Sequence, residues 1–484
     1  MKRIPVWMCL AGLLLALCRL PVAAAATPAA TTLPAPIAAA LKRQGLPTRG
    51  LSIYVQEIGQ PEPLLVVAAD KPRHPASTMK LLTTLATLEE LGPAYRWKTE
   101  AYTSAPIRNG RLDGDLYLKG YGDPDLVIEQ FWLFLRSLRA QGLREIHGDL
   151  VLDQSYFARE SGDSAEFDNQ PLRTYNVLPN ALLVNFQAVS FRFLPQPQAN
   201  RVEIVADPMP ANLEIENRVR LTQNACNGWG SHLGLKVLQR DGQTRVIFSG
   251  GYDAACGDHE LFRAVSEPAA YILGTFRSLW SELGGRFDGG VREQAVPAEA
   301  QLLYTGYSPP LSDIIRSINK YSNNVMARQL LLTLGADRDG PPGTTEKGIA
   351  VIHAWLGHHG LEFPELVLQN GSGLSREEEI SARHLGAVLL TGWRSPYMPE
   401  LISSLPISAM DGTLRGRFNG ETELDGRMHL KTGSLRDVRA IAGYMLDRQG
   451  RRMIVVCLHN SPRAETEAGA ALQDALLQWV YERP

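Results

Sequence analysis

The segment PASTMK places a serine and a lysine three positions apart, Ser77 and Lys80, at the expected start of a helix. Residues at i and i+3 share one face of a helix, so the lysine amine lies beside the serine hydroxyl. A hydroxyl becomes a nucleophile when a base removes its proton, and lysine can be that base when burial or a second cation keeps its amine neutral. The apolar run MKLLTTL is suited to bury Lys80. The pair therefore has two interpretations: a nucleophile with its base, or a helix cap followed by a solvated charge.

The Ser-x-x-Lys pair alone is a weak signal. Because serine and lysine are common, a chain of 484 residues holds roughly two such pairs by chance. A second pair is indeed present in SINK, residues 317–320. The chemistry of PASTMK therefore needs partners elsewhere in the sequence.

Two further short motifs follow at large separations. YSNN contains Ser322 and Asn324 at a helix boundary, and KTG, residues 431–433, lies in a strand near the end of the chain. Each has a simple structural interpretation on its own, because serine and asparagine cap helices and a lysine protects an edge strand. Together, S-x-x-K, S-x-N and K-T-G in this order are the signature of penicillin-interacting serine enzymes. SINK is a chance match to S-x-x-K, because it lies only a few residues before YSNN in the same amphipathic segment and cannot be a distant partner of that motif.

The elements that must position these motifs lie at the two ends of the chain. A strand pair, LSIYVQEI and PLLVVAA, precedes the helix of PASTMK, and three strands close the sequence before a last amphipathic helix, namely HLKTGSL, RAIAGYMLD and RMIVVCLHN. The closing strands need partners, which the N-terminal pair can provide. The predicted fold class is therefore α/β (α+β), with a central antiparallel sheet flanked by helices.

The middle of the chain has the pattern of a β-rich insertion. Short strands alternate with turns, and two stretches read as hairpins, VSFRFLPQPQANRVEIVAD and LGLKVLQRDGQTRVIFSGG, the second with an Asp-Gly turn. The expected division of the chain is a catalytic domain of residues 27–97 and 263–484, an inserted domain of residues 98–186 and an inserted β-rich domain of residues 187–262.

The N-terminus predicts export to the periplasm. A basic MKR, an apolar run and small residues near Ala24 form a secretory signal peptide over residues 1–26. In an oxidising compartment Cys226 and Cys256 are suited to form a disulfide, whereas Cys457 lies in a buried-strand pattern and is expected to be an inert thiol. The net charge of −2 and the lack of Cys-x-x-Cys and His-Glu-x-x-His motifs argue against nucleic acid as a partner and against a metal site.

The likeness to known enzymes extends beyond the three motifs. The chain resembles the low-molecular-mass class C penicillin-binding proteins, the D-alanyl-D-alanine carboxypeptidase/endopeptidases of the penicillin-binding protein 4 type, over nearly its whole mature length. The family carries a transpeptidase-like domain with a large insertion between S-x-x-K and S-x-N, and many members have Asp where this chain has Asn323. The segments that carry the resemblance are GDLYLKGYGDPDL, YNVLPNALLVNF, NKYSNNVMARQLL, NGSGLSR, LPISAMDGTLRGRF and KTGSLRDVRAIAGYM.

The resemblance implies a serine D-Ala-D-Ala carboxypeptidase and D,D-endopeptidase that acts on peptidoglycan peptides and is acylated by β-lactams, without a cofactor or a metal. Ser77 would attack the peptide carbonyl with Lys80 as its general base. Ser322 would pass the proton to the leaving amine, held by Asn324 and Lys431. The substrate-binding groups implied are the side chains of Lys431 and Thr432 for the terminal carboxylate, and the backbone N–H groups of Ser77 and Ser434 for the oxyanion.

Other interpretations stay open on the sequence alone. A β-lactamase shares all three motifs but is normally a far shorter chain, and a penicillin-binding sensor without catalytic activity is expected to carry a membrane anchor after its signal. A GxSxG hydrolase is unsupported, because NGSGLS has the wrong spacing. The sequence does not decide the balance of carboxypeptidase and endopeptidase activity, a loose association with a membrane surface, or a homo-oligomeric state. Asp168, in the inserted block, is a candidate contact for the free amino end of the stem peptide.

Overall fold

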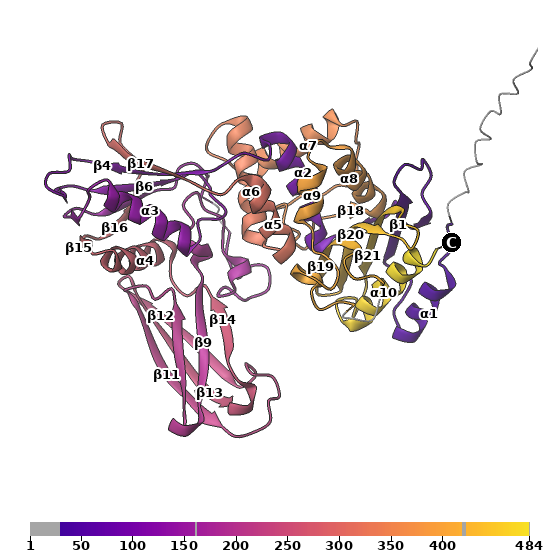
Figure 1. The fold of residues 1–484 in the computed structure, drawn as a ribbon, viewed down its shortest axis with the longest axis horizontal. Helices are drawn as coiled ribbons and strands as arrows, with labels where there is room; N and C mark the ends of the chain where they lie inside the picture. The colour runs from indigo at the N-terminus through magenta and orange to yellow at the C-terminus, as the bar shows by residue number, and fades with distance from the viewer. Residues whose placement is uncertain (1–29, 160–161, 419–422, 484) are drawn as a thin grey trace, which may run out of the picture.

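The body of the protein is built around a sheet that joins the two ends of the chain. The computed structural model describes residues 30–159, 162–418 and 423–483; the predicted signal peptide lies outside them. The C-terminal strands pair antiparallel with the N-terminal strand pair, as expected, and the predicted fold class is confirmed. The five strands follow the order β19 (Met428–Leu435), β20 (Val438–Leu446), β21 (Arg452–Asn460), β1 (Leu51–Glu57) and β2 (Leu65–Val67) (Figure 1).

Alternation along β1 explains how both faces of the sheet are covered. Ile53 and Val55 belong to the apolar core on one face and Tyr54 to the core on the other, because successive side chains of a strand point to opposite sides. The first face is covered by α1 (Ala35–Gln44) and α10 (Glu467–Tyr481), which pack against each other. The helices that contribute to the second core are α2 (Lys80–Leu91), α5 (Leu311–Tyr321), α6 (Asn324–Asp339), α7 (Thr345–His358), α8 (Ala382–Arg394) and α9 (Met398–Ser404).

An arm extends from the helical side of the body (Figure 1). Its main sheet has the strand order β16 (Val291–Glu293), β8 (Leu150–Asp153), β6 (Leu116–Gly120), β4 (Lys98–Thr103) and β17 (Gln301–Tyr307). The arm also contains α3 (Ile128–Ala140), α4 (Pro268–Glu282) and a small sheet of β5 (Arg111–Leu112), β7 (Glu145–Ile146) and β15 (Arg286–Phe287). Gln329 of α6 ties the arm to the body, because its side-chain amide donates to Asn180 O at 3.0 Å and accepts from Asn180 N at 3.0 Å.

Two packed sheets form a leg that projects from the arm (Figure 1). Both predicted hairpins are present in it, and the second turns at Asp241 and Gly242, which have φ angles of 52° and 73°. Cys226 and Cys256 form the predicted disulfide, and Cys457 is a buried free thiol. The strands are β9 (Val189–Gln196), β10 (Arg201–Asp207) and β14 (His259–Arg263) in one sheet, and β11 (Leu213–Thr222), β12 (Leu233–Arg240) and β13 (Gln243–Asp253) in the other.

The arm includes segments that follow residue 262, where the sequence analysis placed the end of the insertion. β17 pairs antiparallel with β4, and α4 contributes Tyr271 and Phe276 to the apolar core that the arm shares with the leg. In the structure the chain therefore leaves the body near residue 98 and returns to it near residue 307.

Among the residues that the structure describes, no helix is both long enough and apolar enough to cross a membrane.

The remaining elements are short. The two-residue strands β3 (Pro72–Arg73) and β18 (Ile380–Ser381) pair with each other. The 3-10 turns are η1 (Ala76–Met79), η2 (Thr174–Asn176), η3 (Asn185–Gln187), η4 (Pro197–Ala199), η5 (Ala254–Cys256) and η6 (Gly412–Leu414).

Candidate active site

Three segments that are far apart in the sequence meet beside the edge strand β19. They are η1 with the start of α2, the junction between α5 and α6, and β19 itself. Lys80 Nζ lies 3.1 Å from Ser77 Oγ and 2.6 Å from Asn324 Oδ1. Lys431 Nζ, from β19, donates to Ser322 Oγ at 2.9 Å. The structure thus brings the four predicted catalytic residues and Lys431 into one site.

Lys80 is fully buried at the start of α2. Burial lowers the pKa of its amine well below the ordinary value, and the nearby amine of Lys431 lowers that pKa further. The buried carboxylate of Glu378 acts in the opposite direction. Because burial is the largest of these effects, Lys80 has the environment of a neutral amine.

The contacts of Lys80 Nζ account for the two hydrogens and the lone pair of a neutral amine. Two partners, Asn324 Oδ1 and the carbonyl oxygen of Ser372, are oxygens that can only accept hydrogen bonds. A neutral amine uses both of its hydrogens on these oxygens, so its lone pair is left for the third neighbour, the hydroxyl of Ser77. This arrangement is suited to the removal of the hydroxyl proton by general base catalysis.

The S-x-N segment divides its residues between structure and site. Ser322 ends α5 in the left-handed conformation, with φ 58°. Asn323 is the N-cap of α6, and its side chain accepts a hydrogen bond from Met326 N at 3.0 Å. The middle residue therefore does the capping, which leaves the side chains of Ser322 and Asn324 available to the two lysines.

The strand β19 presents the third motif at the edge of the central sheet. Its first half is covered, because Leu430 N donates to Pro406 O at 3.0 Å. From Lys431 onward, no further strand of the described chain pairs with this edge. Thr432 donates through its hydroxyl to Thr413 Oγ1 at 2.8 Å, and Ser434 is exposed. The free edge is suited to bind an extended peptide by strand addition.

Gly433 allows β19 to run against the segment that carries the nucleophile. A Cβ atom at Gly433 would lie 2.9 Å from both Ser77 N and Pro75 O, a separation at which one of the two segments would have to shift. The backbone of Ser77 and the backbone that leads to Ser434 are therefore held side by side.

A loop to which the sequence analysis assigned no role completes the site. It is NGSG, residues 370–373, and the carbonyl oxygen of its Ser372 accepts a hydrogen bond from Lys80 Nζ. The buried carboxylate of Glu378 holds the loop by accepting from the backbone N–H groups of Gln369, Asn370 and Gly371 at 2.8–3.1 Å. Two glycines in four residues were the only signal for this loop, and a backbone carbonyl has no residue-type signature.

SINK, the chance match to S-x-x-K, has a structural role close to the site. Lys320 Nζ donates to Leu405 O at 2.9 Å and to Asp411 Oδ2 at 2.5 Å. Asp411 precedes η6, which carries Thr413, the hydrogen-bond partner of Thr432. The ion pair therefore fixes the loop that borders the KTG strand.

Replacing Asp411 by asparagine is expected to weaken this loop. Lys320 is largely buried, whereas Asp411 is partly exposed, so loss of the pair is expected to lower the free energy of unfolding by about 1–2 kcal/mol and to raise KM for a peptide more than it lowers kcat. Urea unfolding and steady-state kinetics measure the two effects. Asp113→Asn, in the exposed Arg111–Asp113 pair, is the control and should change neither. A stability and KM equal to those of the wild type in Asp411→Asn would show that the pair does not hold the loop.

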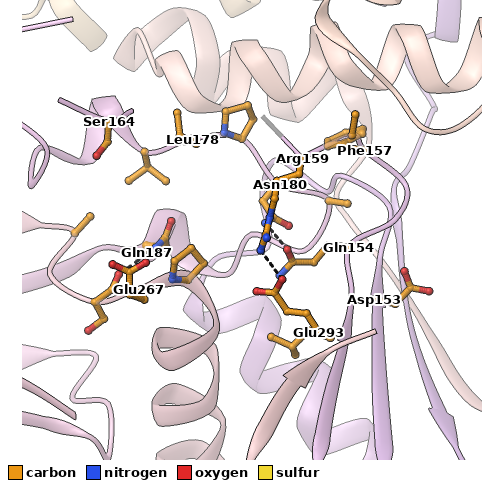
Figure 2. A pocket seen from close by; sticks show the side chains of 18 of the residues that line it. Asp153, Gln154, Phe157, Arg159, Ser164, Leu178, Asn180, Gln187, Glu267 and Glu293 are labelled. Atoms are coloured by element: carbon orange, nitrogen blue, oxygen red, sulfur yellow. Dashed lines mark hydrogen bonds and ion pairs between the residues drawn. The ribbon is translucent and has the colours of Figure 1, made fainter. Parts of the chain in front are cut away.

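Several hollows lie on the arm side of the body, and one of them reaches the site. One of about 400 Å³ is lined by Ser322 and Asn324 together with Asp207 of the leg. A second, of about 720 Å³, is lined by Asn370 and Arg376 of the body and by the arm loop around residues 162–167. A third, of about 740 Å³, continues into the arm; Figure 2 shows its labelled polar groups, including the pairs Asn180–Gln154 and Arg159–Glu293. Only the first of these hollows is lined by predicted site residues.

Asp168 lies in the arm loop, and its carboxylate already has partners. It accepts hydrogen bonds from the hydroxyl of Tyr175 at 2.7 Å and from Asn176 Nδ2 at 2.8 Å. The neighbouring ring of Phe167 is covered by the guanidinium of Arg376, 4.3 Å from the ring centroid. In the described part of the chain, no group of three His, Cys, Asp or Glu side chains is suited to hold a metal ion.

The two lysines predict a bell-shaped dependence of kcat/KM on pH. Activity needs Lys80 neutral, so it is lost as the pH falls through the pKa of Lys80. It needs Lys431 protonated to attract a carboxylate, so it is lost as the pH rises through the pKa of Lys431, which burial lowers to about 7. The descending limb of kcat/KM, which reports the free enzyme, is expected near pH 7 with a pentapeptide substrate.

The control is Lys431→Arg, since arginine keeps its charge at every accessible pH. The descending limb should disappear from its profile, whatever the absolute rate. A descending limb at the same pH in this variant would assign the titration to another group.

Comparisons with known proteins agree with this geometry. Residues 33–483 match the family described as the D-Ala-D-Ala carboxypeptidase 3 (S13) family. The chain is 31% identical over 417 residues to the D-alanyl-D-alanine carboxypeptidase of Actinomadura sp. (strain R39), covering 83% of this chain and 76% of that protein. It is 29% identical over 382 residues to the D-alanyl-D-alanine carboxypeptidase DacB of Haemophilus influenzae, covering 79% of each.

Solved structures show the same architecture. The crystal structure of penicillin binding protein 4 (dacB) from Haemophilus influenzae matches with a TM-score of 0.75 and 25% identity, over 92% of this chain and 99% of that chain. The same protein complexed with a novel β-lactam matches with a TM-score of 0.72. The Bd0816 predatory endopeptidase from Bdellovibrio bacteriovorus, at 16% identity and a TM-score of 0.54, shares the fold.

Proposed function

Because the chain belongs to the D-Ala-D-Ala carboxypeptidase 3 (S13) family, we propose that Ser77 is the nucleophile of a serine D-Ala-D-Ala carboxypeptidase and D,D-endopeptidase. The substrates are peptidoglycan stem peptides and their cross-links, and β-lactams acylate the same serine. The observation that carries the proposal is the set of contacts of Lys80 Nζ, which lies within hydrogen-bond distance of Asn324 Oδ1, the Ser372 carbonyl oxygen and the Ser77 hydroxyl. Because the first two oxygens can only accept, a neutral amine keeps its lone pair for the third.

Acylation follows from this geometry. Lys80 Nζ takes the proton of Ser77 as Oγ attacks the carbonyl carbon of the penultimate D-Ala, and the carbonyl oxygen becomes an oxyanion. The backbone N–H groups of Ser77 and Ser434 stabilise the oxyanion. Removal of one such donor typically costs about 2.7–4 kcal/mol of transition-state stabilisation. The C–N bond then breaks, and an acyl-serine remains.

The leaving amine needs a proton, and Ser322 is placed to supply it. Its hydroxyl accepts a hydrogen bond from Lys431 Nζ at 2.9 Å, which leaves its own proton free for the amine. The proton that Lys80 took from Ser77 then passes to Ser322 and replaces the proton that Ser322 gave to the amine. Water attacks the acyl-serine in the second half of the reaction and regenerates Ser77. A β-lactam leaves no separate amine, because its opened ring stays attached to the acyl group.

Recognition of the terminal D-Ala depends on charge and on the free strand edge. Lys431 and the hydroxyl of Thr432 hold the carboxylate in charge-assisted hydrogen bonds, and the peptide lies along the edge of β19. In a cross-link the terminal D-Ala is replaced by a second peptide. The hollows beside Asn324 and Arg376 give that peptide, or the rest of the stem, room to extend.

The domain division and the location belong to the same proposal. Residues 1–26 direct the chain to the periplasm, where peptidoglycan is the partner. The catalytic body comprises residues 27–97 and about 308–484, and the arm and the leg, residues 98–307, form the insertion; they shape the side of the cleft that meets branched substrate.

The test is product analysis with matched variants. The mature protein is incubated with a pentapeptide ending in D-Ala-D-Ala and, separately, with cross-linked muropeptides, and the products are identified by mass spectrometry. Release of D-Ala and cleavage of the cross-link are expected for the wild type, and neither for Ser77→Ala. If neither substrate is cleaved by the wild type, or if Ser77→Ala cleaves them equally well, the proposed function is wrong.

A further inference from the structure

The imidazole of His74 lies between the segment that leads to Ser77 and the loop that holds Lys80. Its Nδ1 is 3.0 Å from Ala76 N, and its Nε2 is 2.9 Å from the carbonyl oxygen of Ser375. Its backbone is fixed from the central sheet by Asn460, whose Oδ1 accepts from His74 N at 2.7 Å and whose Nδ2 donates to His74 O at 3.0 Å. Both ring nitrogens and both backbone groups of His74 therefore have partners.

The two ring contacts fix one neutral tautomer. A carbonyl oxygen can only accept, so Nε2 carries the hydrogen and donates to Ser375 O; the N–H of Ala76 can only donate, so Nδ1 accepts. Burial lowers the pKa of His74, which favours the neutral ring, and the charges that face it are Glu378, Glu379 and Arg376. A protonated ring would turn an N–H toward the N–H of Ala76 and break that contact.

The peptide that His74 holds is in an unfavourable conformation. Ala76 has φ 45°, a region that residues with a Cβ atom rarely adopt, and such strain persists only where the surroundings enforce it. The surroundings here include Gly373, at which a Cβ atom would lie 1.9 Å from Ala76 O and 2.8 Å from Ser77 N. The direction of the Ser77 N–H depends on this strained peptide.

We propose that His74 is a positioning residue for acylation: its Nδ1 holds Ala76 N–H so that the next N–H, that of Ser77, points into the oxyanion site. His74 does not touch the substrate. Through Ser375, which follows the NGSG loop, His74 also links the segment of Ser77 to that loop. One side chain therefore aligns the N–H of Ser77 with the carbonyl oxygen of Ser372, the partner of Lys80. This inference rests on the proposed role of Ser77.

Two substitutions separate the two nitrogens of His74. Asparagine places an acceptor oxygen near the position of Nδ1, and glutamine places an amide donor near the position of Nε2. His74→Asn should keep the contact to Ala76, whereas His74→Gln should keep only the contact to Ser375. With a misplaced oxyanion donor, kcat for the pentapeptide and the rate of penicillin acylation are expected to fall about 10²-fold in His74→Gln, with KM little changed, and to recover to within about threefold of the wild type in His74→Asn.

Melting temperatures of both variants are measured in parallel. If His74 had only a structural role, kcat would fall in step with the melting temperature. His74→Asn with near wild-type kcat beside a slow His74→Gln supports the inference. Equal rates in the two variants, or losses in kcat that simply follow the loss of stability, would overturn it. Ser77→Ala distinguishes this failure from failure of the proposed function: if Ser77 is not the nucleophile, Ser77→Ala keeps its activity, whatever the result at His74.

Discussion

Replacing Lys80 by methionine is expected to reduce both D-Ala release and penicillin acylation about 10²–10⁴-fold, the usual contribution of a general base. Methionine fills much of the same volume but has no lone pair to take the proton of Ser77. The loss should appear in kcat and in kcat/KM alike, because the base acts in the transition state. Stopped-flow acylation with a chromogenic β-lactam and steady-state peptide hydrolysis measure it.

The same variant has a signature in stability. The pKa of Lys80 is lowered in the folded protein, so between this lowered pKa and the unfolded pKa, near 10.4, the unfolded chain binds a proton that the folded chain does not, and the stability of the wild type rises with pH over that range. The melting temperature of Lys80→Met relative to the wild type should therefore fall between pH 7 and pH 10. Lys236→Met, at an exposed position of the leg, is the control and should show no such trend. A difference that is constant with pH would mean that Lys80 is charged in the folded protein.

Replacing Gly373 by alanine is expected to reduce acylation about 10²-fold, the effect of a small misplacement of reacting groups. Gly373 has φ 81°, and its added Cβ would lie 1.9 Å from the carbonyl oxygen of Ala76. The backbone atom cannot move aside without displacing Ser77 and its N–H. The rate of acylation by penicillin reports the displacement, and the melting temperature is expected to fall as well.

Gly357→Ala is the matched control for this substitution. Gly357 is exposed in α7 and has no atom within 4 Å of an added Cβ, so its rate of acylation should equal that of the wild type. If Gly373→Ala acylates as fast as Gly357→Ala, the loop does not fix the nucleophile segment.

The side chains of the candidate site could be predicted from the sequence because three short motifs identify them by residue type and spacing. Ser77, Lys80, Ser322, Asn324 and Lys431 meet in the structure as their order in the chain suggested. The hairpin of β12 and β13 was also readable, since an Asp-Gly turn between two strand patterns is a local signal.

What the sequence could not reveal depends on contacts without a local pattern. The pairing of β17 with β4 joins residues about 200 positions apart, so no local pattern indicated that α4 and β17 belong to the arm. The acceptor at Ser372 is a backbone carbonyl, and the partner of Lys320 is a single aspartate in a distant loop. His74 carried no motif, because its effect comes from which atoms its two nitrogens meet.

Intact-mass analysis after treatment with ampicillin, followed by peptide mapping, tests the central claim most directly. A neutral Lys80 that activates Ser77 predicts one added ampicillin mass per chain, located on the peptide that contains Ser77, and no added mass in Ser77→Ala. A chain that stays unmodified in the wild type, or an adduct that persists in Ser77→Ala, would contradict the claim.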